Sequence, residues 1–363
     1  MSSSGRFGCV LRVSRGPLAE TEGIVRDVAR AVGLVEGSAG VRAVVDALVR
    51  LEPVSTRRLS RAARLPVPIV ASICGELRKR DVVAFERPAQ LTASGRALFR
   101  AERLAVPACA CPHCAGRGLV VPPALAASVR DVARLARRAP APRFQLDQCH
   151  CTVETKLRRV LALHEADALV GRRVLLLGDD DLVSLAIASI VARFGSGQAL
   201  EQLTVVDADP GVIAFVSREL ARAPFAVACI EHDLRSPLPG ELVGSFDTVL
   251  TDAPYTAAGA RLFLSRAAEA LAGAGTVLFS FGSRRAETTF AIQRDMIRMG
   301  FTIQACVPDF NQYVGAGVLA GTSDLYRLAA STKPMPLVAG TFAGPLYTAE
   351  VRRAGGGSGR HFN

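Results

Sequence analysis

Short apolar runs alternate with longer amphipathic stretches through the second half of the chain. The amphipathic stretches, such as 182–193, place apolar residues at helical spacing. Short runs without polar alternation are typical of strands that are buried on both faces. The pattern therefore predicts a mainly parallel sheet with helices on both faces. The expected strands are residues 173–177, 203–206, 226–230, 246–251, 276–281, 301–307 and 325–328.

This alternation is typical of an α/β domain with a Rossmann-like, methyltransferase-type sheet, which binds nucleotides beyond the ends of its strands. We place this domain at residues 156–345. The last residues, 354–363, are rich in glycine and carry no apolar pattern. We therefore expect a flexible tail over 346–363.

The first hundred residues follow a different pattern. Helical spacing of apolar positions predicts helices over 41–51, 55–63 and 67–80, and two short strands follow at 81–85 and 90–92. Three helices followed by a hairpin resemble a winged-helix domain, which we place at 1–104. The third helix of such a domain can enter a major groove of DNA. The alternative that we favour is a dimerisation or substrate-covering module, which makes a homodimer the expected assembly.

A cysteine-containing segment at 105–155 joins the two predicted domains. Cys111 and Cys114 have the spacing of a zinc knuckle, and Cys149 and Cys151 would complete four thiolates. The second pair has one residue between its cysteines instead of the usual two. Two interpretations stay open. The four residues form a zinc site, or they are buried or redox-active thiols.

Charge is divided unevenly along the 363 residues, whose formal net charge is +11. Residues 1–146 hold 24 Lys and Arg against 11 Asp and Glu, whereas residues 147–363 hold 20 against 22. The basic half keeps a nucleic-acid partner open, although we do not favour it. No apolar stretch has the length of a membrane span and no signal peptide is apparent, so we expect a cytoplasmic protein without a membrane partner.

Acidic residues follow four of the predicted strands. A single Asp at a strand end is as often a helix cap as a functional residue. Four acidic loops in register favour a site, because ligands of such sheets bind at this edge. We expect Asp207 to accept from ribose hydroxyls and Asp233 from an adenine amino group. The loops are Gly178-Asp179-Asp180-Asp181, Asp207-Ala208-Asp209, His232-Asp233-Leu234 and Asp252-Ala253-Pro254-Tyr255.

The loop at 178–181 carries three successive carboxylates. Methyltransferases that use S-adenosylmethionine normally have glycines here, close to the methionine carboxylate. One charge contact at 4 Å contributes roughly 4 kcal/mol at an effective dielectric near 20, before desolvation. The loop therefore favours a cationic ligand, such as decarboxylated S-adenosylmethionine or a polyamine.

The loop at 252–255 resembles the Asp/Asn-Pro-Pro-Tyr motif of amino-group methyltransferases, with Ala253 in place of the first Pro. In that motif the acid and a backbone carbonyl hold the attacking amine, and the aromatic ring packs beside the sulfonium. The Ala253 carbonyl can still accept a hydrogen bond, although the loop loses some rigidity.

Several motifs together resemble the branched-chain polyamine synthase family, the N4-bis(aminopropyl)spermidine synthases, over about residues 40–330. The chain departs from the family at Ala253 and in the thiols of Cys149-His150-Cys151. The motifs are Cys111-Pro112-x-Cys114-x-Gly116-Arg117-Gly118, Asp147-Gln148, Gly178 to Asp181, Asp252 to Tyr255, Tyr313-Val314-Gly315-Ala316 and Ser323-Asp324-Leu325-Tyr326.

The resemblance implies an aminopropyltransferase. Its co-substrate is decarboxylated S-adenosylmethionine, and it converts spermidine to N4-aminopropylspermidine and N4-bis(aminopropyl)spermidine with release of methylthioadenosine. Asp181 would hold the aminopropyl amine, while Asp179 and Asp180 would hold the polyamine or remove its proton. The catalytic candidates are Asp180, Asp181, Asp252 and Tyr255, and the cofactor-binding candidates are Gly178, Asp179, Asp181, Asp207, Asp233 and Pro254.

Two other functions remain open. The Asp-x-Pro-Tyr loop and the basic half are compatible with an amino-group methyltransferase that uses S-adenosylmethionine. A winged-helix transcriptional regulator with a ligand-sensing α/β domain is the third possibility, and it requires salt-dependent, sequence-selective DNA binding.

Overall fold

The structure is a computed structural model that describes residues 17–99, 111, 113–114, 116–195, 199–282, 286–314 and 321–355. The chain divides into two compact units, Met1–Pro107 and Ala108–Asn363. The first unit ends three residues beyond the domain boundary expected at 104.

The N-terminal unit is built from helices around one apolar core. α3 begins at Ser55, whose side-chain oxygen accepts a hydrogen bond from the Arg58 N–H at 3.3 Å. The core is filled by fully buried side chains that include Leu48, Leu59 and Leu77. The helices are α1 (Pro17–Val32), α2 (Gly37–Leu51), α3 (Thr56–Ala63), α4 (Val67–Arg78) and α5 (Ala93–Phe99).

The two strands expected at 81–85 and 90–92 are reduced to isolated bridges. Val83 pairs with Leu91, and Val54 pairs with Ala89, both antiparallel. Helix α5, which the apolar pattern did not predict, follows directly after them. The expected helices are therefore present, and the two segments pair in a short antiparallel hairpin, in which the Ala84 N–H donates to the Gln90 carbonyl at 2.9 Å and the Thr92 N–H to the Val82 carbonyl at 3.0 Å. The winged-helix domain stays a prediction.

The C-terminal unit contains one seven-stranded sheet in the order β3-β2-β1-β4-β5-β7-β6. The first five strands along the chain run parallel, and β7 is antiparallel to both of its neighbours, β5 and β6. This arrangement confirms the Rossmann-like prediction. The strands are β1 (Arg173–Leu177), β2 (Gln202–Asp207), β3 (Ala226–Glu231), β4 (Phe246–Asp252), β5 (Leu271–Phe281), β6 (Thr302–Gln312) and β7 (Thr322–Ala330).

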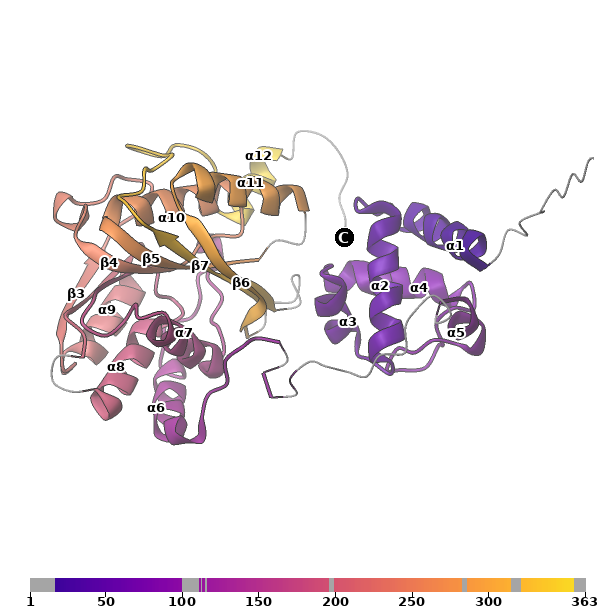
Figure 1. Cartoon of the computed structure of the whole chain (residues 1–363), viewed down its shortest axis with the longest axis horizontal. Helices are drawn as coiled ribbons and strands as arrows, with labels where there is room; N and C mark the ends of the chain where they lie inside the picture. The colour runs from indigo at the N-terminus through magenta and orange to yellow at the C-terminus, as the bar shows by residue number, and fades with distance from the viewer. Residues whose placement is uncertain are drawn as a thin grey trace, which may run out of the picture. The chain divides into compact units, whose positions relative to one another are not determined.

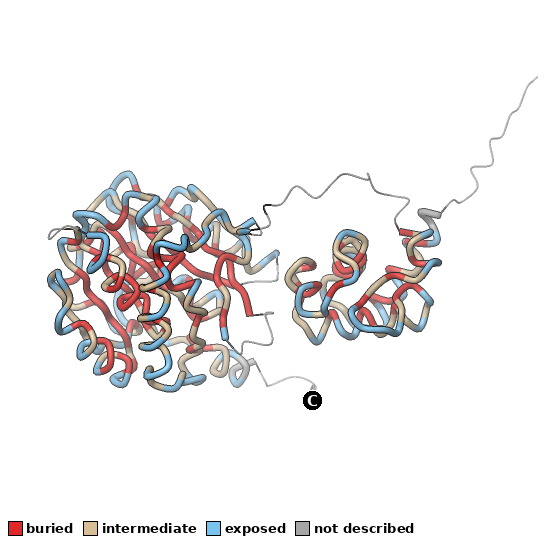
Figure 2. Tube along the Cα trace, turned by 90° about the horizontal axis from the view of Figure 1, so that it is seen from below, coloured by how far each residue is buried: buried red, intermediate tan, exposed pale blue. Residues whose placement is uncertain are grey.

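Helices cover both faces of this sheet (Figure 1). Successive side chains of a strand point to opposite faces, so Leu175 and Leu177 enter one apolar cluster while Val174 and Leu176 enter the other. The buried strands run through the centre of the unit (Figure 2). α10 (Ala257–Ala270) and α11 (Ala286–Arg298) cover one face, and α6 (Ala126–Ala136), α7 (Val153–Glu165), α8 (Val183–Phe194) and α9 (Pro210–Leu220) cover the other.

The segment after β7 differs from the expected tail. We expected a flexible tail from residue 346, whereas the structure has helix α12 (Thr348–Gly355) there. Leu346 and Tyr347 are buried and join the apolar cluster of the α10 face. Two apolar side chains thus anchor this segment. The expectation of a flexible tail was based only on the glycine-rich composition of its last residues. Residues 356–363 lie outside the described residues.

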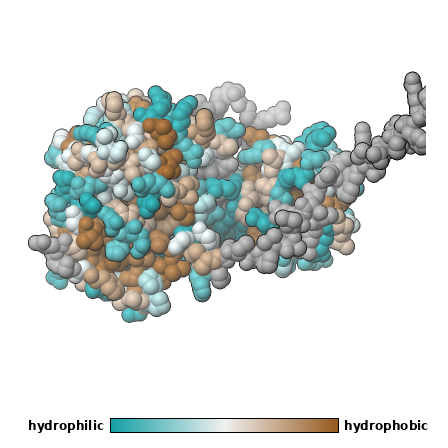
Figure 3. All heavy atoms as spheres, viewed as in Figure 1, coloured by the Kyte–Doolittle hydropathy of each residue, from teal (hydrophilic) through white to brown (hydrophobic). Residues whose placement is uncertain are grey.

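The visible face of the C-terminal unit is largely hydrophilic, with smaller hydrophobic patches between (Figure 3). Within the described ranges, no helix combines the length and the apolar character needed to cross a bilayer.

Candidate active site

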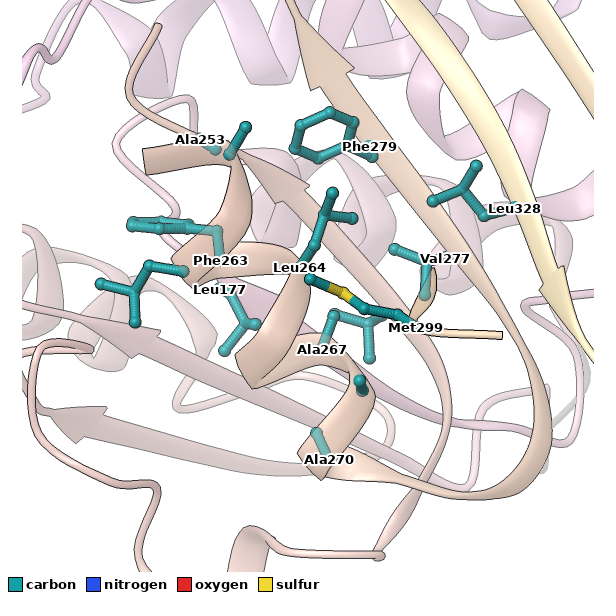
Figure 4. Packing of buried hydrophobic residues seen from close by; sticks show 14 of the residues in the cluster. Leu177, Ala253, Phe263, Leu264, Ala267, Ala270, Val277, Phe279, Met299 and Leu328 are labelled. Atoms are coloured by element: carbon teal, nitrogen blue, oxygen red, sulfur yellow. The ribbon is translucent and has the colours of Figure 1, made fainter. Parts of the chain in front are cut away.

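The two acidic loops at 178–181 and 252–255 lie at the same edge of the sheet. β1 and β4 are parallel neighbours, and Leu177 is in register with Thr251. Ala253 packs in the same apolar cluster as Leu177, Phe263 and Phe279 (Figure 4). The residue that replaces the motif's first Pro therefore anchors its loop against α10 and β5 by burial.

Asp179 faces the beginning of α8. Its Oδ1 accepts hydrogen bonds from the backbone N–H groups of Val183 and Ser184, at 2.7 and 3.2 Å, and its Oδ2 accepts from the Ser184 hydroxyl. Burial raises the pKa of Asp179 to about 7. These contacts are those of a helix cap, which was the alternative to cofactor binding for a single Asp at a strand end.

Asp207 at the end of β2 accepts backbone hydrogen bonds. Its two carboxyl oxygens receive the N–H groups of Asp179 at 2.9 Å and Asp209 at 2.8 Å. Burial raises its pKa. Asp207 thus fixes the path of the loop that begins at Gly178, whose backbone has a φ of +79°.

Asp181 lies in a buried cluster of opposite charges. Its Oδ2 is 2.6 Å from Nη1 of Arg159, and its Oδ1 accepts from the Cys151 N–H and lies 4.0 Å from Nζ of Lys156. Burial opposes ionisation of Asp181, but Arg159 and Lys156 outweigh it and lower its pKa to about 2. Asp181 is therefore an anion that two cations of α7 already neutralise.

Asp252 is the second carboxylate that contacts Arg159. Its Oδ2 accepts from Nη2 of Arg159 and from the Tyr313 hydroxyl, each at 2.6 Å. The Tyr255 hydroxyl in turn donates to the Tyr313 oxygen at 2.7 Å. Burial raises the pKa of Asp252 to about 6 even though Arg159 opposes this. The chain Tyr255–Tyr313–Asp252 is thus a continuous hydrogen-bonded row.

Pro254 is buried, and its carbonyl accepts a hydrogen bond from the Thr256 N–H at 2.7 Å. Tyr255 is half-buried and packs edge-on against Phe281, with ring centroids 5.5 Å apart. Pro254 therefore shapes the turn, while Tyr255 supplies an aromatic wall next to Asp252.

Asp180 differs from the carboxylates on either side of it. It is half-buried, and its Oδ2 accepts one hydrogen bond, from the Cys149 N–H at 3.2 Å. Among the residues that the structure describes, no cationic side chain forms an ion pair with it. Burial together with the charges of Asp181, Asp207 and Asp252 holds the pKa of Asp180 well above its usual range.

A segment at 147–152 runs along this edge and contacts each part of it. The side chain of Asp147 accepts from the Thr348 N–H at 2.8 Å, so it caps α12. Gln148 donates to Asp209 at 3.2 Å. Residues further along the segment pair with the end of β6, where Cys151 forms a bridge with Tyr313. The Asp147-Gln148 motif therefore ties the acidic loops to the C-terminal helix.

Asp233 lies apart from the buried cluster. Its side chain is 48% exposed and accepts from the Arg235 N–H at 2.9 Å. The Arg235 guanidinium lies 5.1 Å from the ring centroid of Tyr347 and forms an ion pair with Glu350 at 2.6 Å. Asp233 remains accessible to a ligand, whereas Asp179 and Asp181 are not.

The cysteines of the expected zinc site have different surroundings. Cys149 lies next to Asp180, and burial with the charges of Asp181, Asp180 and Asp252 raises its pKa to about 11. Cys151 is buried beside Lys156, whose Nζ is 3.7 Å from its sulfur. Hydrogen bonds with the Gly118 and Gly116 backbone and with the Cys111 thiol lower the pKa of Cys114, and both of these cysteines are free thiols. Within the described part of the chain, no group of three or more His, Cys, Asp or Glu could hold a metal ion. Cys149 and Cys151 thus have different neighbours, and the zinc site formed by all four cysteines stays a prediction.

The sequence interpretation missed Lys156 and Arg159, and it gave no role to Tyr313, although Tyr313 begins one of the family motifs. Lys156 and Arg159 are fully buried and occupy the same face of α7 as Val160 and Leu163. Charged residues at helical spacing within an apolar stripe are the signal that could have found them. Of the late Tyr313 motif, Gly315 and Ala316 lie outside the described residues, as does Pro112 of the cysteine motif.

Comparison with known protein families shows to which family this chain belongs. Residues 128–337 match the branched-chain polyamine synthase A C-terminal domain. The chain belongs to the branched-chain polyamine synthase family. It is 30% identical over 277 residues to the N(4)-bis(aminopropyl)spermidine synthase of Thermococcus kodakarensis, an alignment that covers 74% of this chain and 76% of the relative. An uncharacterised protein of Methanocaldococcus jannaschii is 33% identical over 309 residues, with 84% and 77% covered.

A crystal structure within the branched-chain polyamine synthase family resembles the whole chain. It is a mutein of the enzyme from Thermus thermophilus in complex with N4-aminopropylspermidine and 5′-methylthioadenosine. The two structures share 26% sequence identity and a TM-score of 0.71, and the match covers 92% of this chain and 98% of that one. The expected membership of this family is thus confirmed.

Proposed function

We propose that this protein is an aminopropyltransferase. It moves the aminopropyl group of decarboxylated S-adenosylmethionine to a nitrogen of a spermidine-like polyamine and releases methylthioadenosine. The acceptor is spermidine and then N4-aminopropylspermidine, as the names of the related enzymes suggest. The family membership and the ligands bound to the related Thermus thermophilus enzyme support this proposal.

The main observation behind this proposal is that the Asp180 carboxylate forms no ion pair with a cationic side chain of the described residues. Asp180, Asp181 and Asp252 lie close enough to influence one another's ionisation, and the two buried cations contact only the latter two. A half-buried carboxylate without a cationic partner favours a positively charged ligand. A methionine carboxylate at the same place would be repelled, so decarboxylated S-adenosylmethionine suits the site better than S-adenosylmethionine.

The chemistry asks little of the protein beyond alignment and proton removal, because a sulfonium is a good leaving group. A neutral polyamine nitrogen attacks the methylene next to sulfur, the C–S bond breaks, and its electron pair stays on the sulfur of methylthioadenosine. Asp180 then accepts the proton that the alkylated nitrogen loses, for which its raised pKa suits it. At the second transfer the attacking nitrogen is tertiary and carries no proton, so the product is a quaternary ammonium.

The remaining predicted residues would bind different parts of the two substrates. Asp252, held by Tyr313, orients the attacking amine, and Tyr255 forms the wall beside the sulfonium. Asp207, the last residue of β2, would bind the ribose with the remaining acceptor capacity of its two oxygens, which also accept the Asp179 and Asp209 N–H groups. Asp233 follows β3, where it suits the adenine. Asp179 and Asp181 act indirectly in this proposal, because α8 and Arg159 already occupy their oxygens.

Product mass tests this function. The purified protein is incubated with spermidine and either decarboxylated S-adenosylmethionine or S-adenosylmethionine, and the products are weighed. We expect one and two additions of aminopropyl with the first donor and no methyl addition with the second. Methyl addition alone would identify an amino-group methyltransferase, and the absence of both products would contradict the proposal.

For the N-terminal unit we propose dimerisation or substrate covering rather than DNA binding. The basic residues at the end of α4 are engaged within the unit: Lys79 and Arg80 each pair with Glu76 at 2.6 Å, and Arg78 donates to the Ala84 carbonyl at 3.0 Å. All three basic side chains at this helix end thus have partners within the unit. Light scattering of the purified protein should give twice the 38.3 kDa mass of one chain.

A further inference from the structure

Arg159 lies completely buried between two carboxylates that belong to different loops. Its Nη1 donates to Asp181 after β1 and its Nη2 to Asp252 after β4, each at 2.6 Å. The side chain comes from α7, whereas the two carboxylates lie at the ends of strands of the sheet. One guanidinium therefore links the two acidic loops whose relative position defines the site.

The third nitrogen of Arg159 fixes the plane of the guanidinium. Nε donates to Oδ1 of Asn311 at 2.8 Å, and the Asn311 amide is itself held by the Ser323 oxygen at 2.9 Å. Nη2 also lies 3.1 Å from the Tyr313 oxygen. A planar group with partners at all three nitrogens holds one orientation, which a lysine ammonium cannot reproduce.

The charges around Arg159 make it decisive for the ionisation of the cluster. Three carboxylates at Asp180, Asp181 and Asp252 face two cations, Lys156 and Arg159, both from α7. Other titratable and charged groups lie around them, which are the thiols of Cys149 and Cys151, the hydroxyls of Tyr255 and Tyr313, the Asp207 carboxyl, the His150 imidazole and the Arg158 guanidinium. Without Arg159, three carboxylates would share one cation, and at least one more of them would take up a proton.

We propose that Arg159 is a positioning residue that keeps Asp181 and Asp252 ionised together, and thereby leaves Asp180 as the one carboxylate of the cluster that is free to accept the proton of the attacking amine. This inference rests on the proposed aminopropyl transfer. According to this inference, a buried residue of α7 determines which carboxylate of the cluster acts as the base.

Replacement of Arg159 should therefore change the pH dependence of the reaction and not only its rate. In Arg159→Gln the cluster loses one positive charge, so the carboxyl of Asp252 protonates at higher pH. We expect kcat to fall by about 100-fold or more, and the acidic limb of the kcat/KM profile to move to higher pH by about one unit. Arg159→Lys keeps the positive charge but loses the planar guanidinium that binds both carboxylates. The acidic limb of its kcat/KM profile should therefore stay near the wild-type position, while kcat falls by about 10-fold.

Arg158 offers a matched control on the same helix. It is also fully buried, but its Nη2 donates to the Phe310 carbonyl at 2.7 Å and to Thr155 at 3.1 Å, away from the acidic cluster. Arg158→Gln should lower the melting temperature with the acidic limb unchanged. A purely structural role of Arg159 would give its variants this same behaviour.

The assay uses the full chain with spermidine and decarboxylated S-adenosylmethionine, product mass as readout, and melting curves for each variant. An Arg159→Gln profile that superimposes on the wild type, with kcat within about threefold, would overturn the inference. If Arg159→Gln does not fold, Arg159→Lys decides. An acidic limb of the kcat/KM profile that moves to higher pH by about one unit in this variant would contradict the inference, because lysine keeps the positive charge. Wild-type protein that yields no aminopropyl product would instead refute the proposed function.

Discussion

Asp179 and Asp181 are separated by a single residue and are both almost fully buried, yet the pKa values of their carboxyls move in opposite directions, to about 7 and about 2. Asp179 meets only the neutral donors at the start of α8, which do not compensate for its burial. Asp181 meets Arg159 and Lys156, which do. The same residue type within one tripeptide thus acts as a helix cap and as the anion of a buried ion pair.

The first prediction concerns stability. Because the pKa of Asp179 is raised on folding, the folded state binds more protons than the unfolded state between about pH 4 and 7. Its contribution to the free energy of unfolding therefore decreases as the pH rises through this window. Asp179→Asn cannot titrate, so its stability deficit relative to wild type should be larger at pH 5 than at pH 7.5, by a few kcal/mol at most.

Urea unfolding of both proteins at these two pH values measures the difference. Ser184→Ala is the matched control, since it removes one donor to Asp179 without removing the carboxyl. A deficit for Asp179→Asn that is equal at both pH values would show that Asp179 does not titrate in this range.

The second prediction separates Asp180 from Asp181. Asp180→Asn removes the uncompensated carboxylate, so kcat should fall by about 100-fold or more while stability changes little. Asp181→Asn leaves Arg159 and Lys156 without their shared anion, and breaking a buried pair costs about 3–5 kcal/mol. Turnover and melting temperature of the two variants provide the test. An Asp180→Asn enzyme with near-normal turnover would remove Asp180 from the mechanism.

The acidic edge of the sheet could be predicted from the sequence because each of its residues follows an apolar run directly. Asp207 and Asp252, the last residues of β2 and β4, lie where parallel strands must end together. The partners of these acids could not be predicted in this way. Arg159 lies in a helix, and Tyr313 follows a strand whose register shifts between Val307 and Asn311.

The cysteines show the limit of a spacing argument. The sequence distance between Cys149 and Cys151 permits a shared metal, but in the structure the two side chains have different neighbours. The Cys149 thiol donates to the Val314 carbonyl at 3.6 Å, whereas the Cys151 sulfur lies 3.7 Å from Nζ of Lys156.

The third prediction concerns Asp252. Its pKa, raised to about 6 by burial, places its loss of charge within an accessible range. If the ionised form orients the amine, kcat/KM should fall as the pH drops below about 6, and Asp252→Asn should lower kcat by about 100-fold at neutral pH. Initial rates between pH 5 and 9 provide the measurement. A flat acidic limb in the wild type would exclude an ionised carboxylate with this pKa from the reaction.

The last prediction concerns the hydrogen-bonded row that ends at Asp252. The Tyr313 hydroxyl stabilises the anion of Asp252 by direct donation, and a hydrogen bond to a charged group contributes about 1.5–3 kcal/mol. Since one pKa unit corresponds to 1.36 kcal/mol, Tyr313→Phe should move the acidic limb to higher pH by about one to two units. Tyr255→Phe removes a hydroxyl that reaches Asp252 only through Tyr313, so its shift should be smaller. Equal shifts in the two variants would show that the row does not transmit its effect in this order, and that Tyr255 acts on Asp252 by another route.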